Sequence, residues 1–264
     1  MGIFQFTGSI CQRFVDFLGG LSLLAFEAFG SILSGRIRWG LVIRQICEIG
    51  YRSQPVVILT GVFTGAVLTA QTFFQFRTLG MESAVGPVVS VAMCRELGPV
   101  LVGLMIAGRV GAAMSAELGT MKVTQQIDAL RALAVHPTDY LVVPRVLAMM
   151  VSMPLLVAES IFFGILASFL VSTKVLGVNS AYYIANVYKF TEAEDILMGL
   201  IKVFFFGIII VIVSCREGLL AKDGAVGVGR ATTEAVVISS LAVLIVNFFL
   251  TMALNIPFPA GTND

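Results

Sequence analysis

The chain has 264 residues, of which 58% are hydrophobic and 12% charged, and its mean hydropathy is +0.96. Soluble domains carry about 25% charged residues, so this composition excludes a soluble domain and indicates an integral membrane protein. The net charge of +1 argues against a nucleic-acid partner. The apolar runs are continuous rather than alternating, which predicts an all-α protein whose helices cross the membrane.

Residues 1 to about 34 predict an amphipathic helix that lies along a membrane surface. Polar and small residues recur at helical spacing on one side, opposite an apolar face: Ser9, Arg13, Asp16, Gly20 and Glu27. A weakly hydrophobic first transmembrane span is the alternative. Four arginines follow between positions 36 and 52. We therefore expect residues 1–52 to form an interfacial helix and a basic linker.

Five transmembrane helices are predicted in the remainder, residues 53–264, which we take with 1–52 as one domain. Their approximate ranges are 55–77, 87–118, 141–172, 196–214 and 235–256. With the N-terminus in the cytoplasm, ten Lys and Arg residues lie inside and three outside. The positive-inside rule then predicts a cytoplasmic N-terminus, an external C-terminus, and cytoplasmic loops at 119–140 and 215–232.

The second span carries a row of small residues at every fourth position, which we call the small-residue row: Gly103, Ala107, Gly111, Ser115 and Gly119. Small side chains on one helix face allow another helix backbone to approach closely. The row therefore predicts helix packing. It leaves open whether the neighbouring helix belongs to the same chain or to a second copy.

Three charged residues in apolar spans form the candidate binding site: Arg95, Glu96 and Lys202. Ionisable groups at such positions are costly and indicate function. Their similar distance from the outer helix ends predicts that they meet in an outward-facing cavity between the second and fourth spans. Two cations and one carboxylate suit an anionic headgroup such as a lipid phosphate. A structural ion pair between Glu96 and Lys202 is the alternative. For Glu159, a partnered packing role is expected.

The segment near 117–135 predicts a short amphipathic helix at the cytoplasmic face. Val123, Ile127 and Leu130 form its apolar stripe, and Thr120 or Thr124 can cap it. A helix held between two membrane spans is suited to receive motion from a soluble partner. An ordinary interfacial loop helix is the alternative.

Neither a nucleotide site nor a catalytic set is readable in this sequence. The glycines of residues 224–230 lack the Lys-Ser/Thr ending of a phosphate-binding loop. The four cysteines have no metal or disulfide spacing. We therefore predict no catalytic residue, metal or cofactor on this chain, and if ATP drives the protein, a partner chain binds ATP and Mg and hydrolyses the nucleotide.

Three stretches of the chain resemble the MlaE/YrbE family of ABC-transporter permeases. They are RELGPVLVGLMIAGRVGAAMSAELGTMKVTQQIDALRAL, HPTDYLVVPRVLA and GAVGVGRATTEAVV. The resemblance extends over essentially the whole chain. It implies a single permease domain in the bacterial inner membrane that moves glycerophospholipids between the inner and outer membranes and maintains outer-membrane lipid asymmetry.

The resemblance also implies partners and residue roles. A homodimer is expected to bind two MlaF-like ATPase subunits, each carrying an MlaB-like STAS-domain subunit, beneath a periplasmic MlaD-like hexamer of MCE domains. Arg95, Glu96 and Lys202 match positions lining an outward-opening lipid cavity. The coupling helix that docks on the ATPase would comprise Glu117, Lys122, Gln126, Asp128 and Arg131.

Two other functions are compatible with the residues. An ion-coupled carrier would use Glu96 and Glu159 as proton sites, and its transport would follow a proton gradient without an ATPase. A non-transporting membrane anchor of a lipid-binding complex would assemble normally and tolerate loss of Glu96 and Lys202.

Overall fold

The computed structural model describes residues 2–35 and 37–257 of the chain. In this part every regular element is helical. The elements are α1 (Gly2–Leu33), α2 (Trp39–Ile49), η1 (Tyr51–Ser53), α3 (Gln54–Arg77), η2 (Glu82–Ala84), α4 (Val85–Ala92), η3 (Met93–Leu97), α5 (Gly98–Ile106), η4 (Ala107–Gly111), α6 (Ala112–Val123), α7 (Gln126–Ala132), η5 (Thr138–Val142), α8 (Val143–Leu170), η6 (Val171–Val175), α9 (Ser180–Phe190), α10 (Ala193–Leu219) and α11 (Gly224–Leu254).

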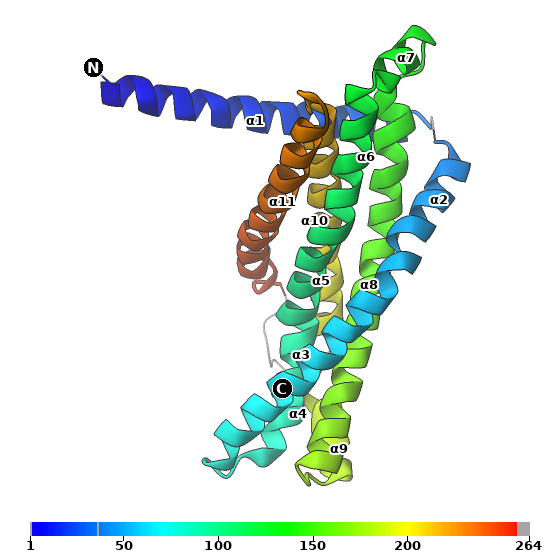
Figure 1. Cartoon of the computed structure of the whole chain (residues 1–264). Helices are drawn as coiled ribbons and strands as arrows, with labels where there is room; N and C mark the ends of the chain where they lie inside the picture. Colours follow the sequence, from blue (N-terminus) through cyan, green and yellow to red (C-terminus); the bar gives the residue numbers. More distant parts are fainter. Residues whose placement is uncertain (1, 36, 258–264) are drawn as a thin grey trace.

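Six helical stretches in the described part are long and apolar enough to cross a membrane. Five of them run along the length of the molecule, whereas α1 lies across one end of the bundle (Figure 1). This arrangement confirms the expected all-α protein with an N-terminal interfacial helix and five membrane-spanning helices. The side chains of Ser9 and Arg13 in the polar stripe of α1 lie outside the described residues.

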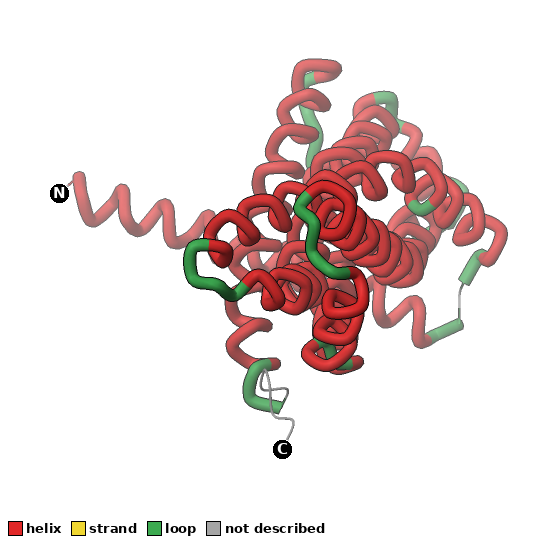
Figure 2. The backbone as a smooth tube through the Cα atoms, turned by 90° about the horizontal axis from the view of Figure 1, so that it is seen from below, coloured by secondary structure: helices red, strands yellow, loops and turns green. Residues whose placement is uncertain are grey.

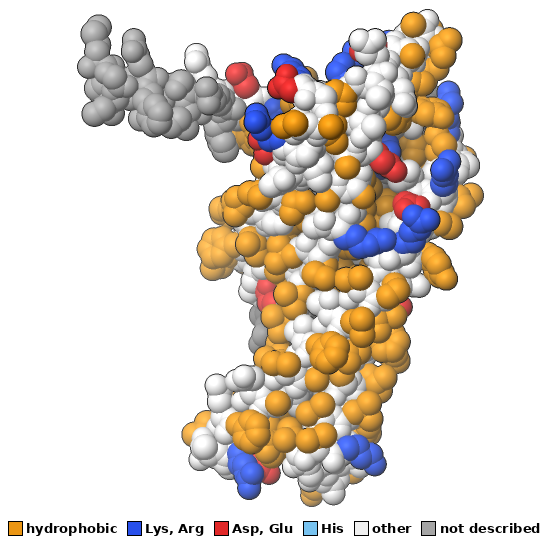
Figure 3. Space-filling view, in the orientation of Figure 1, with side chains coloured by type: hydrophobic (Ala, Val, Ile, Leu, Met, Phe, Trp, Pro, Cys, Tyr) orange, Lys and Arg blue, Asp and Glu red, His pale blue; other side chains and the backbone are white. Residues whose placement is uncertain are grey.

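Loops and helices gather at two ends, which we name by their short helices. The α7 end also carries α1 and the short α10–α11 connection, and the α9 end carries α4 (Figure 1). Lys, Arg, Asp and Glu side chains concentrate towards the α7 end and at the tip of the α9 end, and hydrophobic side chains cover the region between (Figure 3). The two loops predicted to share one side thus lie at the same end.

Two stretches expected to be linkers are largely helical. The first span is continuous with α2, so that one apolar stretch runs from Trp39 to Arg77. Pro55 suggested a helix start, but it occupies the first turn of α3, where its missing N–H costs no helical hydrogen bond. Similarly, α10 extends to Leu219 and α11 begins at Gly224, so only residues 220–223 separate them.

The second span is the longest apolar stretch in the described part, at 42 residues. At 1.5 Å per residue it measures about 63 Å, roughly twice the thickness of a bilayer core. It contains two π-helical turns, Met93–Leu97 and Ala107–Gly111. Pro99 lies two residues after the first of them, in the first turn of α5. The span therefore projects beyond the lipid and changes its helical winding beside Arg95 and Glu96.

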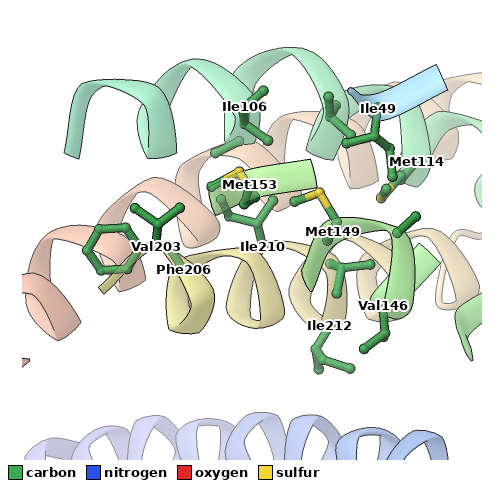
Figure 4. Packing of buried hydrophobic residues seen from close by; sticks show 14 of the residues in the cluster. Ile49, Ile106, Met114, Val146, Met149, Met153, Val203, Phe206, Ile210 and Ile212 are labelled. Carbon is green, nitrogen blue, oxygen red and sulfur yellow. The ribbon is translucent and has the colours of Figure 1, made fainter. Parts of the chain in front are cut away.

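The small-residue row packs against helices of the same chain. A Cβ at Gly111 would lie 2.8 Å from Ser214 Oγ of α10, and one at Gly119 would lie 3.3 Å from the Ala221 Cβ. Buried side chains of α5, α8 and α10 pack beside the row; Ile106, Met153 and Ile210 lie next to one another (Figure 4). The sequence left open which helix packs against the small-residue row. In the structure these are α10 and α11 of the same chain.

A second close crossing joins α3 to α8. A Cβ at Gly65 would lie 2.1 Å from the backbone oxygen of Gly164. One at Gly61 would lie 2.5 Å from the backbone oxygen of Ser160. Viewed from below the orientation of Figure 1, the spans form one compact group and α1 projects away from it (Figure 2). Small residues therefore set the spacing of the bundle at two places, between the second span and α10 and between α3 and α8.

Candidate functional site

Lys202 of α10 is fully buried in the described structure, with 0% exposure. Its ammonium has three N–H groups, and it makes three hydrogen bonds. Its ammonium donates hydrogen bonds to Glu96 Oε1 at 2.6 Å and to the backbone oxygen of Arg95 at 2.9 Å. A third hydrogen bond goes to Thr251 Oγ1 of α11 at 2.8 Å. One buried cation therefore joins the second, fourth and fifth spans.

The local sequence explains why a lysine fits there. In an α-helix the N–H of residue 99 would bond to the carbonyl of residue 95, but Pro99 has no N–H to donate. Lys202 supplies a donor to that carbonyl. Gly199, one turn earlier on α10, allows the close approach, because a Cβ there would lie 2.2 Å from the backbone oxygen of Cys94. Proline, glycine and lysine together thus build this contact.

Arg95 lies beside this lysine but pairs with a different carboxylate. Its side chain donates to Asp195 in the first turn of α10 and to Asn255 Oδ1, at 3.3 Å, after the end of α11. Asp195 also accepts from the backbone N–H of Glu192 at 3.0 Å, in a capping box that begins α10. The guanidinium is thereby fixed between the ends of two spans.

The charge of the cluster differs from the expectation. The sequence predicts two cations beside one carboxylate, whereas the structure adds Asp195 and gives two cations and two carboxylates. Asp195 directly precedes the predicted span 196–214, and in sequence a capping residue at a helix start looks the same as the end of a polar loop. The predicted cation surplus at the base of the cavity is therefore absent.

Asn247 and Thr251 were also missed by the sequence analysis. Asn247 donates to Glu96 Oε2 at 3.0 Å, and Thr251 donates to Glu96 Oε1 at 3.0 Å. Their spacing of four residues puts both polar side chains on one face of an otherwise apolar helix. That spacing was the readable signal that α11 contributes to the site.

A cavity of about 770 Å³ opens next to the cluster at the α9 end. Arg95, Glu96 and Asp195 line one part of it, while Val88 and Val91 of α4 contribute to an apolar wall. Lys202 does not line the cavity; it lies behind Glu96, whose side chain is 38% exposed. The structure thus brings the three predicted residues together but presents only two of them to a ligand. A charged base beside an apolar wall suits an amphiphilic molecule.

Glu159 lies apart from this site in the middle of α8 and is partly exposed. Within the described residues it makes no hydrogen bond or ion pair, so the partner expected for it is not found. The apolar surroundings of its span provide no basic group at hydrogen-bonding distance.

The predicted coupling segment has two helical parts. Lys122 lies in the last turn of α6, and Asp128 in α7 contacts both Lys122 at 3.5 Å and Arg131 at 3.3 Å. Gln126 is exposed at the start of α7, and the backbone before it has a positive φ of 59° at Gln125.

The remaining predicted coupling residue and caps differ from the expectation. Glu117 lies on α6 and pairs with Arg145 of α8 at 2.7 Å. Gly119 does not end the span, because α6 continues to Val123. Thr120 and Thr124 do not cap α7; their hydroxyls donate back to carbonyls one turn earlier in α6.

Comparisons with known proteins identify related chains. Residues 42–253 match the family described as Permease MlaE. A probable ABC transporter permease protein of Rickettsia conorii is 44% identical over 252 residues, which cover 94% of this chain and 97% of that protein. One of Synechocystis is 42% identical and covers 85% and 86%. The Arabidopsis thaliana Protein TRIGALACTOSYLDIACYLGLYCEROL 1, chloroplastic, is 38% identical, covering 88% of this chain and 67% of that protein.

Proposed function

The chain belongs to the MlaE permease family, and we propose that it is the transmembrane subunit of an ATP-driven system that moves glycerophospholipids between the inner and outer membranes of a bacterium. As a family member it is a multi-pass membrane permease. The relatives named as ABC transporter permeases support an ATPase partner. The proposed task is maintenance of lipid asymmetry in the outer membrane.

The cavity at the α9 end is the observation that carries the lipid assignment. Its apolar wall on α4 can accommodate acyl chains, and Arg95 and Glu96 provide polar groups for a headgroup. Because the cluster as a whole is neutral, it favours a headgroup that both donates and accepts hydrogen bonds over a simple anion. The name of the Arabidopsis relative, which contains that of a glycerolipid, supports the same substrate class.

The proposed assembly follows the family resemblance. Two copies of the chain would form a homodimer with two MlaF-like ATPase subunits, two MlaB-like STAS-domain subunits and an MlaD-like MCE-domain hexamer. The N-terminus and the α7 end would lie in the cytoplasm, the C-terminus and the α9 end in the periplasm. The greater number of Lys and Arg residues at the α7 end supports this orientation in the inner membrane.

The proposed mechanism transfers motion along the second span. ATP and Mg bind to the partner, and closure of the ATPase dimer moves α7, whose Asp128 and Arg131 are exposed for docking. The continuous helix from Val123 to Glu82 links this movement to the cavity at its other end. Movement of the second span, together with α10 and α11, towards the other copy of the proposed homodimer then closes the cavity around Arg95 and Glu96 and expels the lipid.

Reconstituted transport tests the proposal. The chain and its ATPase are placed in vesicles containing fluorescent phosphatidylethanolamine, and transfer of that lipid to a periplasmic acceptor is measured with and without ATP. We expect transfer to require ATP and to fall in a Glu96→Ala, Lys202→Ala double variant that still assembles. Transfer by the isolated chain without the ATPase would refute the proposal. Normal transfer by the assembled variant would favour the anchor function.

An ion-coupled carrier is the second candidate, and it is favoured by Glu159, which has no partner among the residues that the structure describes. A carboxylate without a basic neighbour in an apolar span can take up and release a proton. This function predicts that Glu159→Gln abolishes transport driven by a proton gradient when no ATPase is present. The ATP-driven system predicts no such transport in either the parent or the variant.

A further inference from the structure

A second cavity lies at the opposite end of the bundle, between α2, α6 and the start of α8. Its volume is about 630 Å³, and we call it the α2–α6 groove. Arg44 and Glu48 line it from α2, Glu117 from α6 and Arg145 from α8. The apolar side chain of Met121 also lines it, so the groove combines charged groups with an apolar surface.

The faces of α2 indicate what surrounds this groove. Trp39 and Ile43 form an exposed apolar stripe, with 65% and 60% exposure, and Val42 packs into the bundle. Arg44 and Glu48 lie on the remaining side, towards the groove. In a soluble protein, a surface helix turns its charged residues outward to water and its apolar residues inward to the core. In α2 the outward stripe is apolar. The exposed stripe of α2 therefore suits contact with lipid, and its charges suit a polar ligand in the groove.

The charged groups of the groove are only partly satisfied within the chain. Arg44 is exposed and makes no hydrogen bond or ion pair among the described residues. Arg145 is 5% exposed; it pairs with Glu117, but its Nε has no hydrogen-bond partner in the described structure. The Glu117 side chain remains 60% exposed. The groove thus presents a free guanidinium and an accessible carboxylate.

We propose that the α2–α6 groove holds the headgroup of a phospholipid drawn from the leaflet at the α7 end. Arg44 takes the phosphate, because a guanidinium forms charge-assisted hydrogen bonds with phosphate oxygens. Glu117 takes an ammonium group, so phosphatidylethanolamine is preferred over phosphatidylglycerol. This inference rests on the proposed lipid transport but assigns a second lipid site, about 40 Å from the first along the second span at 1.5 Å per residue.

Photo-crosslinking in vesicles tests the site. The full chain with its ATPase is reconstituted in an equal mixture of phosphatidylethanolamine and phosphatidylglycerol. A photoreactive phenylalanine analogue replaces Met121 in the groove, Val91 in the α9-end cavity, or Leu59, which is 56% exposed on α3. Lipid adducts are then identified by mass spectrometry. We expect the adduct at position 121 to be mainly phosphatidylethanolamine.

Two variants identify the headgroup contacts. Arg44→Ala should lower the adduct at position 121 by about tenfold, the factor expected for one charge-assisted hydrogen bond, and leave the adduct at position 59 unchanged. Glu117→Gln should shift the adduct towards phosphatidylglycerol. Lys222→Ala is the matched control, because Lys222 is an exposed cation at the same end and lies outside the groove; it should change neither adduct.

The outcomes separate the two proposals. Adducts at position 91 but not at 121 would overturn the groove site and leave the proposed function intact. Adducts at neither position would overturn lipid transport itself. An adduct at position 121 that is insensitive to Arg44→Ala, or that responds equally to Lys222→Ala, would be ordinary bilayer lipid and would also overturn the groove site.

Discussion

Replacing Lys202 by methionine tests whether the buried lysine holds three spans together. Methionine has a similar length and no charge, so the change removes the ammonium while filling most of its space. The backbone oxygen of Arg95 then has no donor from Lys202, and Glu96 loses its ion-pair partner within the described part of the chain. The Thr251 hydroxyl stays within hydrogen-bonding distance of Glu96 Oε1 and of the backbone oxygen of Asn247, and can donate its single proton to either.

The expected cost follows from these contacts. Breaking a buried ion pair by removing one partner costs about 3–5 kcal/mol, because the other charge is left without compensation. Glu96 is 38% exposed and keeps two hydrogen bonds, from Asn247 and Thr251, so the lower end applies. We expect Lys202→Met to lower the free energy of unfolding by about 3 kcal/mol.

A double-mutant cycle shows whether the loss comes from the pair. Combining Lys202→Met with Glu96→Gln removes both charges, and the combined loss should be about 1–2 kcal/mol smaller than the sum of the single losses. Unfolding is followed by denaturant titration of the purified protein in detergent micelles. Lys222→Met, at an exposed lysine, is the control and should change stability by no more than about 0.5 kcal/mol. Additive losses would refute the coupling.

Three further predictions address the packing, the coupling helix and the α9 end. Gly65→Ala should lower the free energy of unfolding by about 1–3 kcal/mol in the same titration, because its Cβ would meet the α8 backbone. Gly229→Ala is the control and should have no such effect, because open space surrounds Gly229. Equal losses in the two variants would contradict the packing argument. Asp128→Lys should leave the basal ATPase rate of the complex unchanged and reduce ATP-driven lipid transfer, and unchanged transfer would exclude α7 as the coupling helix. Burial raises the pKa of Tyr183, whose hydroxyl lies 2.8 Å from Ser168 Oγ. The contribution of Tyr183 to the free energy of unfolding is therefore complete below the ordinary phenol pKa of about 10 and is lost as the pH rises above it. Tyr183→Phe should make alkaline unfolding of the α9 end less pH-dependent.

The sequence predicted the spans because hydropathy depends on each stretch alone. The predicted ends of the spans were wrong where a proline or charged residues indicated the end of a helix. Pro55 is compatible with a helix start that directly follows another helical turn. Arg44 and Arg52 before it lie in α2 and η1 rather than in a loop. Periodicity alone does not distinguish a charged linker from a helix whose charged face borders a groove.

The candidate site was only partly predictable for a similar reason. Arg95 and Lys202 were noticeable because charges are rare in apolar spans. Asp195 was not, because it follows a polar loop, and its role depends on where α10 begins relative to η3. Pairings between residues about one hundred positions apart depend on how the helices cross. A single sequence without related sequences holds no record of those crossings.

The packing of the small-residue row restricts how motion could reach the site. The row faces α10 and α11 at close distances, and Lys202 ties the same three spans together near the other end. Sliding of the second span along α10 would break the hydrogen bonds of Lys202 and drive Gly111 past Ser214. A push at α7 would therefore move the second, fourth and fifth spans as one body, with displacement relative to α2 and α3. The α2–α6 groove lies on the boundary between these parts, where such a displacement changes its width.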